Sequence, residues 1–126
     1  MNRAPVIAAI EAARRTPFRP GTHDCALFVA SVVQAKTGKD YAKKWRGKYK
    51  TVDAGVKALK KAGYEDHIAL VESTFKEIPV SAARFGDIAV VGDALGIVSG
   101  HVIFVLRPEG LGTVDLLTAS RAFRVA

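Results

Sequence analysis

The sequence predicts an α+β domain in which N-terminal helices pack on a C-terminal antiparallel β-sheet. In the first half of the chain apolar residues recur at helical spacing, whereas from about Ile78 they form short β-branched runs separated by turn residues. Strands so close together leave no room for the long crossovers of a parallel sheet, so the sheet should be antiparallel. The 126 residues are 49% hydrophobic and contain no internal repeat or low-complexity linker, so we expect one domain over residues 1–126.

Helix-end signals delimit three helices in the first half of the chain. The expected helices run from Pro5 to about Thr16, from about Asp24 to Thr37 and from Val52 to Ala62. Pro5 suits a first helical turn, Asp24 suits the N-cap of the second helix, and Gly38 and Gly63 are typical residues just after a helix. Residues 40–45 are expected to add a short turn of helix.

Turn residues divide the second half of the chain into strands. Gly92-Asp93, Ser99-Gly100 and Pro108-Glu109-Gly110 each mark a turn. The expected strands run from Ile88 to Val91, from Ala94 to Val98, from His101 to Leu106 and from Leu111 to Leu117. We expect the helical face formed by Phe28, Val29 and Val32 to pack against this sheet.

The single cysteine, Cys25, lies at the expected start of the second helix. Unpaired backbone N–H groups and the positive end of the helix dipole favour a thiolate there, and a thiolate near a histidine is a minimal arrangement for covalent acyl transfer. The alternative is that Cys25 is a small buried hydrophobic residue, because it shares a helical face with Phe28 and Val29. One cysteine excludes an internal disulfide, and three widely separated histidines give no metal signal, so we expect no cofactor.

Basic residues are concentrated in one part of the chain. The chain has 19 basic and 12 acidic residues, a net charge of +7, and most of the excess lies between Lys36 and Lys61. Trp45 and Tyr49 interleave with these residues, as aromatic residues do on nucleic-acid surfaces, but no nucleic-acid-binding motif accompanies them. A solvated basic face is the commoner explanation, and such a face could also meet an anionic cell-wall polymer, packaged DNA or an acidic protein. A basic nucleic-acid-binding accessory protein that uses Lys43 to Lys61 is kept as an alternative function.

The N-terminal residues contain no recognisable targeting segment. Residues 1–16 lack the basic, apolar and cleavage-site order of a signal peptide, and no apolar run approaches the length of a membrane span. We therefore expect a soluble protein of cytosolic origin without membrane insertion.

The order of these motifs resembles that of NlpC-type cysteine peptidases, which have a compact papain-like fold and cut peptide bonds in bacterial peptidoglycan. The shared order is a helix that opens with Asp24-Cys25, a later Gly86-Asp87 that starts an apolar strand, and a short hairpin. The closer resemblance is to small proteins encoded among phage and prophage tail genes. The matching stretches are residues 23–30, Arg46-Gly47-Lys48-Tyr49, Gly55, Ala58-Leu59, Gly63, residues 86–91, residues 94–97, Gly110-Leu111 and residues 121–125. The resemblance implies a single papain-like or NlpC-like domain.

The resemblance also implies a Cys–His dyad, whose completeness depends on how one strand is aligned. In the peptidases a histidine opens the strand that follows the Gly-Asp strand. Aligning residues 94–97 with that strand places Ala94, which cannot accept a proton, at the position of the base. A second alignment uses His101 and restores a Cys25–His101 dyad, but it lacks the glycine found two residues after the histidine. We favour the first alignment, in which His101 lies one hairpin further on and outside hydrogen-bond reach of the Cys25 thiol.

The other histidines and aspartates near these motifs are expected to have structural roles in preference to catalytic ones. His23 is expected to pack within its loop and is a weaker alternative base, and His67 lies in a polar segment that should be solvent-exposed. Asp24 is expected to cap its helix, and Asp87 is expected to bond backbone N–H groups where its strand begins.

The resemblance therefore implies a phage or prophage tail-tip protein, made in the host cytoplasm and present in the virion, with other tail proteins as partners. In the favoured interpretation it is a structural docking module with an incomplete dyad. In the alternative it is a tail peptidase, in which Cys25 attacks a peptide carbonyl of peptidoglycan and His101, or else His23, transfers the proton.

Overall fold

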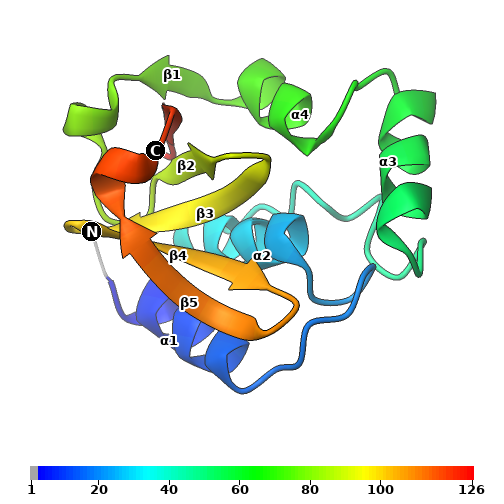
Figure 1. Ribbon diagram of the computed structural model, residues 1–126, viewed down its shortest axis with the longest axis horizontal. Coiled ribbons are helices and arrows are strands. Elements are labelled where there is room, and N and C mark those ends of the chain that lie inside the picture. The colour runs from blue at the N-terminus through cyan, green and yellow to red at the C-terminus, as the bar shows by residue number, and fades with distance from the viewer. Residues whose placement is uncertain (1–2) are drawn as a thin grey trace.

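In residues 3–126, which the computed structural model describes, four α-helices are followed by six β-strands and two short 3₁₀ turns. The helices are α1 (Ala4–Arg14), α2 (Cys25–Thr37), α3 (Val52–Lys61) and α4 (His67–Thr74). The other elements are β1 (Lys76–Ile78), η1 (Val80–Ala82), β2 (Ile88–Val91), β3 (Ala94–Ser99), β4 (Val102–Arg107), β5 (Gly110–Asp115), η2 (Leu116–Thr118) and β6 (Arg121–Arg124). This arrangement confirms the predicted α+β class (Figure 1).

The three predicted helices are present, and their ends follow local signals. Asp24 accepts a hydrogen bond from the Leu27 N–H at the start of α2, and Gly38 ends this helix with a φ of 85°. Helix α4 was not predicted, and it is capped in the same way by the side chain of Asp66. Residues 41–47 form hydrogen-bonded turns instead of the expected turn of helix. Within residues 3–126 no helix is both long and apolar enough to cross a membrane.

All strand pairs in the sheet are antiparallel, and the strand order is β1-β6-β2-β3-β4-β5. Strands β2 to β5 form the predicted series of hairpins, in which Ile88 pairs with Ile97 across β2 and β3. The last strand, β6, lies between β1 and β2, and its Phe123 also pairs with Ile88. The C-terminal segment is therefore an interior part of the sheet (Figure 1).

The sheet buries a different cluster of side chains on each of its two faces. On one face, Phe28, Val29 and Val32 of α2 pack with Ile88 and Phe123, as the sequence predicts. Residues of α1 complete this cluster. The opposite face buries a second cluster, Ala89, Val98, Ile103 and Val105, against side chains of the η1 and η2 segments. Helix α2 is consequently held on the sheet, with its first residue at one edge of the core.

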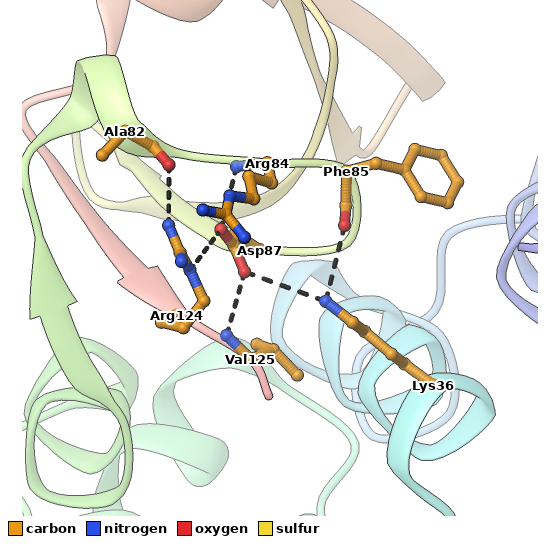
Figure 2. Close-up of polar contacts among 7 residues, drawn as sticks. All are labelled: Lys36, Ala82, Arg84, Phe85, Asp87, Arg124 and Val125. Atoms are coloured by element: carbon orange, nitrogen blue, oxygen red, sulfur yellow. Dashed lines mark hydrogen bonds and ion pairs between the residues drawn. The ribbon is translucent and has the colours of Figure 1, made fainter. Parts of the chain in front are cut away.

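A buried carboxylate attaches the C-terminal end of α2 to the sheet (Figure 2). Asp87 is 0% exposed and accepts hydrogen bonds from the Arg84 N–H at 2.8 Å and the Val125 N–H at 3.0 Å. The guanidinium Nε of Arg124 lies 3.1 Å from Asp87, and the Nζ of Lys36 lies 3.9 Å from it. The predicted role of Asp87, bonding backbone N–H groups at the start of its strand, is confirmed.

Lys36 links this carboxylate to α2. Its ammonium also donates to the carbonyl of Phe85 at 3.4 Å. Burial lowers the pKa of Lys36, and the neighbouring carboxylate of Asp87 opposes that shift. Since a buried charge is tolerated only when it is paired, the three charged groups of Asp87, Lys36 and Arg124 depend on one another.

Candidate functional site

The N-terminal end of α2 is held by a second buried carboxylate. Asp24 is 8% exposed, and its Oδ1 accepts the Leu27 N–H at 3.0 Å. Its Oδ2 accepts the Gly21 N–H at 3.1 Å and the hydroxyl of Tyr49. The predicted capping role of Asp24 is confirmed, and the same side chain also fixes a loop that is distant in sequence.

That loop contains the Arg-Gly-x-Tyr motif, and each of its named residues is bonded to α2 or to the residues just before it. The Nε of Arg46 donates to Asp40 at 2.8 Å, and its terminal nitrogen donates to the Ser31 hydroxyl on α2 at 3.1 Å. The Gly47 N–H donates to the carbonyl of Gly21 at 2.7 Å. Tyr49 donates to Asp24, and its pKa is strongly raised by burial and by that carboxylate, so the phenol stays neutral.

Cys25 is the first residue of α2, and its side chain is partly buried beside the start of β3. Burial raises the pKa of the thiol, and the carboxylates of Asp24 and Asp93 raise it further. Hydrogen bonds with the backbone of Leu95 and Ala26 lower the pKa but do not outweigh burial. Burial therefore outweighs the stabilisation of the thiolate that the helix start predicts, and it favours the neutral thiol of Cys25.

Neither of the two histidines proposed as a base shares the surroundings of Cys25. His101 is exposed in the turn between β3 and β4, whereas Cys25 contacts the first residues of β3. Because a strand rises about 3.4 Å per residue, the length of β3 separates the two by roughly 17 Å. His23 packs edge-on against Phe28, with ring centroids 6.5 Å apart, and lines a separate cavity of about 230 Å³ between α1 and α2.

The third histidine, His67, lines the same cavity as Cys25. It begins α4 and is partly exposed, as its polar segment predicts, but its imidazole is also hydrogen-bonded to the backbone of a distant turn. Its Nε2 lies 2.6 Å from the carbonyl oxygen of Asp93, and since a carbonyl only accepts, Nε2 carries a proton. The helical pattern of Ile68, Leu70 and Val71 after Asp66 was the sequence signal for α4 and hence for the position of His67.

Cys25 and His67 line one cavity of about 410 Å³ between α2, α3, α4 and the sheet. Its lining is mostly apolar and includes Leu70 and Leu106. Helix α3 supplies one wall, through Val52, Val56 and Leu59, and stands at the edge of the molecule (Figure 1). Such a cavity has the size and the apolar character of small-molecule and side-chain binding pockets.

Comparison with known proteins adds a family assignment. No curated protein and no solved structure matches the chain. Residues 2–125 match the family described as a domain of unknown function, DUF6950. Because this match extends over nearly the whole sequence, the chain belongs to the DUF6950 family.

Proposed function

We propose that the chain is a non-catalytic docking module with an NlpC-like fold, present at the tail tip of a phage or prophage particle and made in the host cytoplasm. The main observation behind this proposal is that the Cys25 thiol lies against the start of β3, where the sequence has Ala94 and no base. The module keeps an apolar cavity at that place, and its partners are other tail proteins.

Three features support the NlpC-like correspondence. The cysteine opens a helix that packs on an antiparallel sheet. Asp87 immediately precedes the buried strand β2, and the next strand, β3, passes the thiol at Leu95. This contact favours the alignment that matches residues 94–97 with the histidine-bearing strand of the peptidases, and disfavours the alignment that uses His101.

The state of the thiol argues against acyl transfer. A catalytic cysteine needs a base within hydrogen-bond reach, or a nearby cation, to form its thiolate. Burial and two carboxylates instead raise the pKa of Cys25. His67 donates through Nε2 to the carbonyl of Asp93, whereas the groups that act on the Cys25 thiol are the backbone of Leu95 and Ala26 and the carboxylates of Asp24 and Asp93, none of which is a histidine.

Particle composition and cell-wall cleavage test this proposal. We expect the epitope-tagged chain to co-purify with tails of particles produced by the encoding strain, and Cys25→Ser and His101→Ala particles to keep wild-type infectivity. The purified chain should release no soluble fragments from peptidoglycan. Absence of the chain from purified tails would refute the docking role. Release of peptidoglycan fragments by the wild type, lost in Cys25→Ser, would establish the peptidase instead.

Restoring a histidine tests the correspondence at Ala94 directly. Ala94 contributes to the lining of the cavity beside Cys25, and its methyl group also packs against the second cluster on the opposite face of the sheet, so the variant tests whether an imidazole at this first residue of β3 reaches the thiol. A nearby imidazolium stabilises a thiolate, so Ala94→His should speed alkylation of Cys25 by iodoacetamide at about pH 7 by about tenfold or more. Ala94→Asn, which is polar but does not titrate, should react as slowly as the wild type.

The alkylation rates distinguish the competing interpretations. A folded Ala94→His variant that labels at the wild-type rate would contradict the proposed alignment of β3. Fast labelling of the wild type that slows in His101→Ala would instead identify a Cys25–His101 dyad. Thermal melts of each variant confirm that the rates refer to folded protein.

A further inference from the structure

One segment, residues 43–61, accounts for the entire net charge of the chain. It contains eight basic residues and one acidic residue, whereas the whole chain has a net charge of +7. Within residues 3–126, only Arg46 and Lys60 of these eight have a carboxylate within 4.0 Å. The six without such a partner are Lys43, Lys44, Lys48, Lys50, Lys57 and Lys61, and all six are exposed. The segment therefore presents a field of unneutralised positive charge.

The same segment forms one wall of the apolar cavity. Its lining residues alternate with the exposed lysines and are Trp45, Tyr49, Val52, Gly55, Val56 and Leu59. Val52 is 60% exposed at the start of α3, which is high for a large aliphatic side chain that borders a cavity. Apolar surface inside and positive charge outside thus occur together along residues 43–61.

We infer that this cavity binds an acidic segment of a partner protein, which inserts a bulky apolar side chain between α2 and α3 while its carboxylates meet the surrounding lysines. This inference rests on the proposed docking function and specifies the chemistry of the partner. Buried apolar anchors surrounded by polar contacts supply most of the energy of protein interfaces, and complementary charge adds rate and selectivity.

The aromatic residues favour a peptide over a nucleic acid. Binding of single strands relies on aromatic faces that are free to stack on bases. Trp45 instead packs edge-on against Tyr64, with ring centroids 6.4 Å apart. The ring of Tyr49 covers Gly55, where an added Cβ would lie 2.9 Å from it, and its hydroxyl is held by Asp24. Phosphates could meet the lysines, but they would leave the apolar cavity unfilled.

Binding of labelled peptides to the full chain tests this inference. The probe is a fluorescein-labelled peptide of about 15 residues, rich in Glu and Asp, with two Phe residues at i and i+4 spacing. One matched peptide has Ser at both Phe positions, and the other has Gln and Asn at the acidic positions. Fluorescence anisotropy should show saturable binding of the probe, weakened about tenfold or more by either change.

Variants of the chain locate the site. Val52→Asp removes apolar surface at an exposed helix start where an acidic residue is tolerated, and Lys57→Glu reverses an exposed charge on α3. Each should weaken binding of the probe about fivefold or more. Arg15→Glu, an equal charge reversal at the exposed end of α1, should leave binding unchanged.

Several results would overturn the inference. Equal binding of the probe and its Ser-substituted form would mean general charge attraction without the cavity. Tighter binding of an oligo(dT) strand or of phosphatidylglycerol vesicles, with displacement of the probe, would assign the surface to nucleic acid or to lipid. If the chain co-purifies with tails but does not bind the peptide, the proposed peptide site is wrong and the docking function stands. If the chain binds the peptide but is absent from tails, the tail location is wrong and the peptide site stands.

Discussion

Replacing Asp87 by alanine is expected to lower the free energy of unfolding by about 3 kcal/mol or more. The substitution leaves two backbone donors and the cations of Lys36 and Arg124 without their shared carboxylate (Figure 2). The cost is large because Asp87 is fully buried and water cannot replace its oxygens without opening the core. Urea denaturation followed by the fluorescence of the single tryptophan, Trp45, measures the change.

An exposed ion pair provides the control for the Asp87 variant. Glu11 pairs with Arg14 at 3.1 Å on the surface of α1, where both side chains are about half exposed. Glu11→Ala removes one carboxylate, as Asp87→Ala does, but should change the free energy of unfolding by less than about 0.5 kcal/mol. Similar losses in the two variants would contradict the view that burial of Asp87 determines its contribution.

Replacing Gly21 by alanine is expected to destabilise the protein by about 4 kcal/mol or more, or to prevent folding. An added Cβ would lie 1.7 Å from the carbonyl oxygen of Tyr49, which is backbone and cannot move aside without displacing the loop. The φ of Gly21, +85°, adds a smaller penalty of its own. The displaced loop contains the Tyr49 hydroxyl that Asp24 binds, so the start of α2 should loosen as well.

Gly38 separates the cost of a left-handed backbone from the cost of the contact with Tyr49. It has the same φ of +85°, but an added Cβ there would meet nothing within 4 Å. Gly38→Ala should therefore cost only about 1–2 kcal/mol, the price of a left-handed backbone with a side chain. The free energies of unfolding of the Gly21→Ala and Gly38→Ala variants, measured by the same urea denaturation, differ by the cost of the contact with Tyr49. Equal destabilisation would show that Gly21 is required for its φ alone.

The elements that the sequence predicted correctly are those specified by neighbouring residues. The capping oxygen of Asp24 and the left-handed Gly38 act within one turn of α2, so the limits of this helix are readable from local sequence. The hairpins from β2 to β5 are likewise joined by short turns whose residues are diagnostic. Helix α4 was missed because it is only eight residues long and begins in a polar run.

The candidate site was only partly predictable. Cys25 and the loop of Tyr49 were identified as motifs, but their connection through Asp24 is a contact between residues 25 positions apart. His67 was set aside because its segment is polar, and only the packing of α4 brings it to Asp93 and the cavity. The raised pKa of Cys25 reflects how deeply the fold buries the thiol, a quantity that the residues around it in sequence do not specify.

The sequence by itself determined the α+β class, the limits of α1 to α3 to within about two residues, and the antiparallel hairpins. It also determined the cap that Asp24 supplies and the bond of Asp87 to the backbone where its strand begins, because both are hydrogen bonds formed near by in the chain. The tertiary structure alone decided the interior position of β6, the joining of Lys36 and Arg124 at Asp87, and the cavity beside Cys25. These features arise from pairing and packing between distant segments, whose free energies are set by burial and by the exclusion of water, and no local pattern records them.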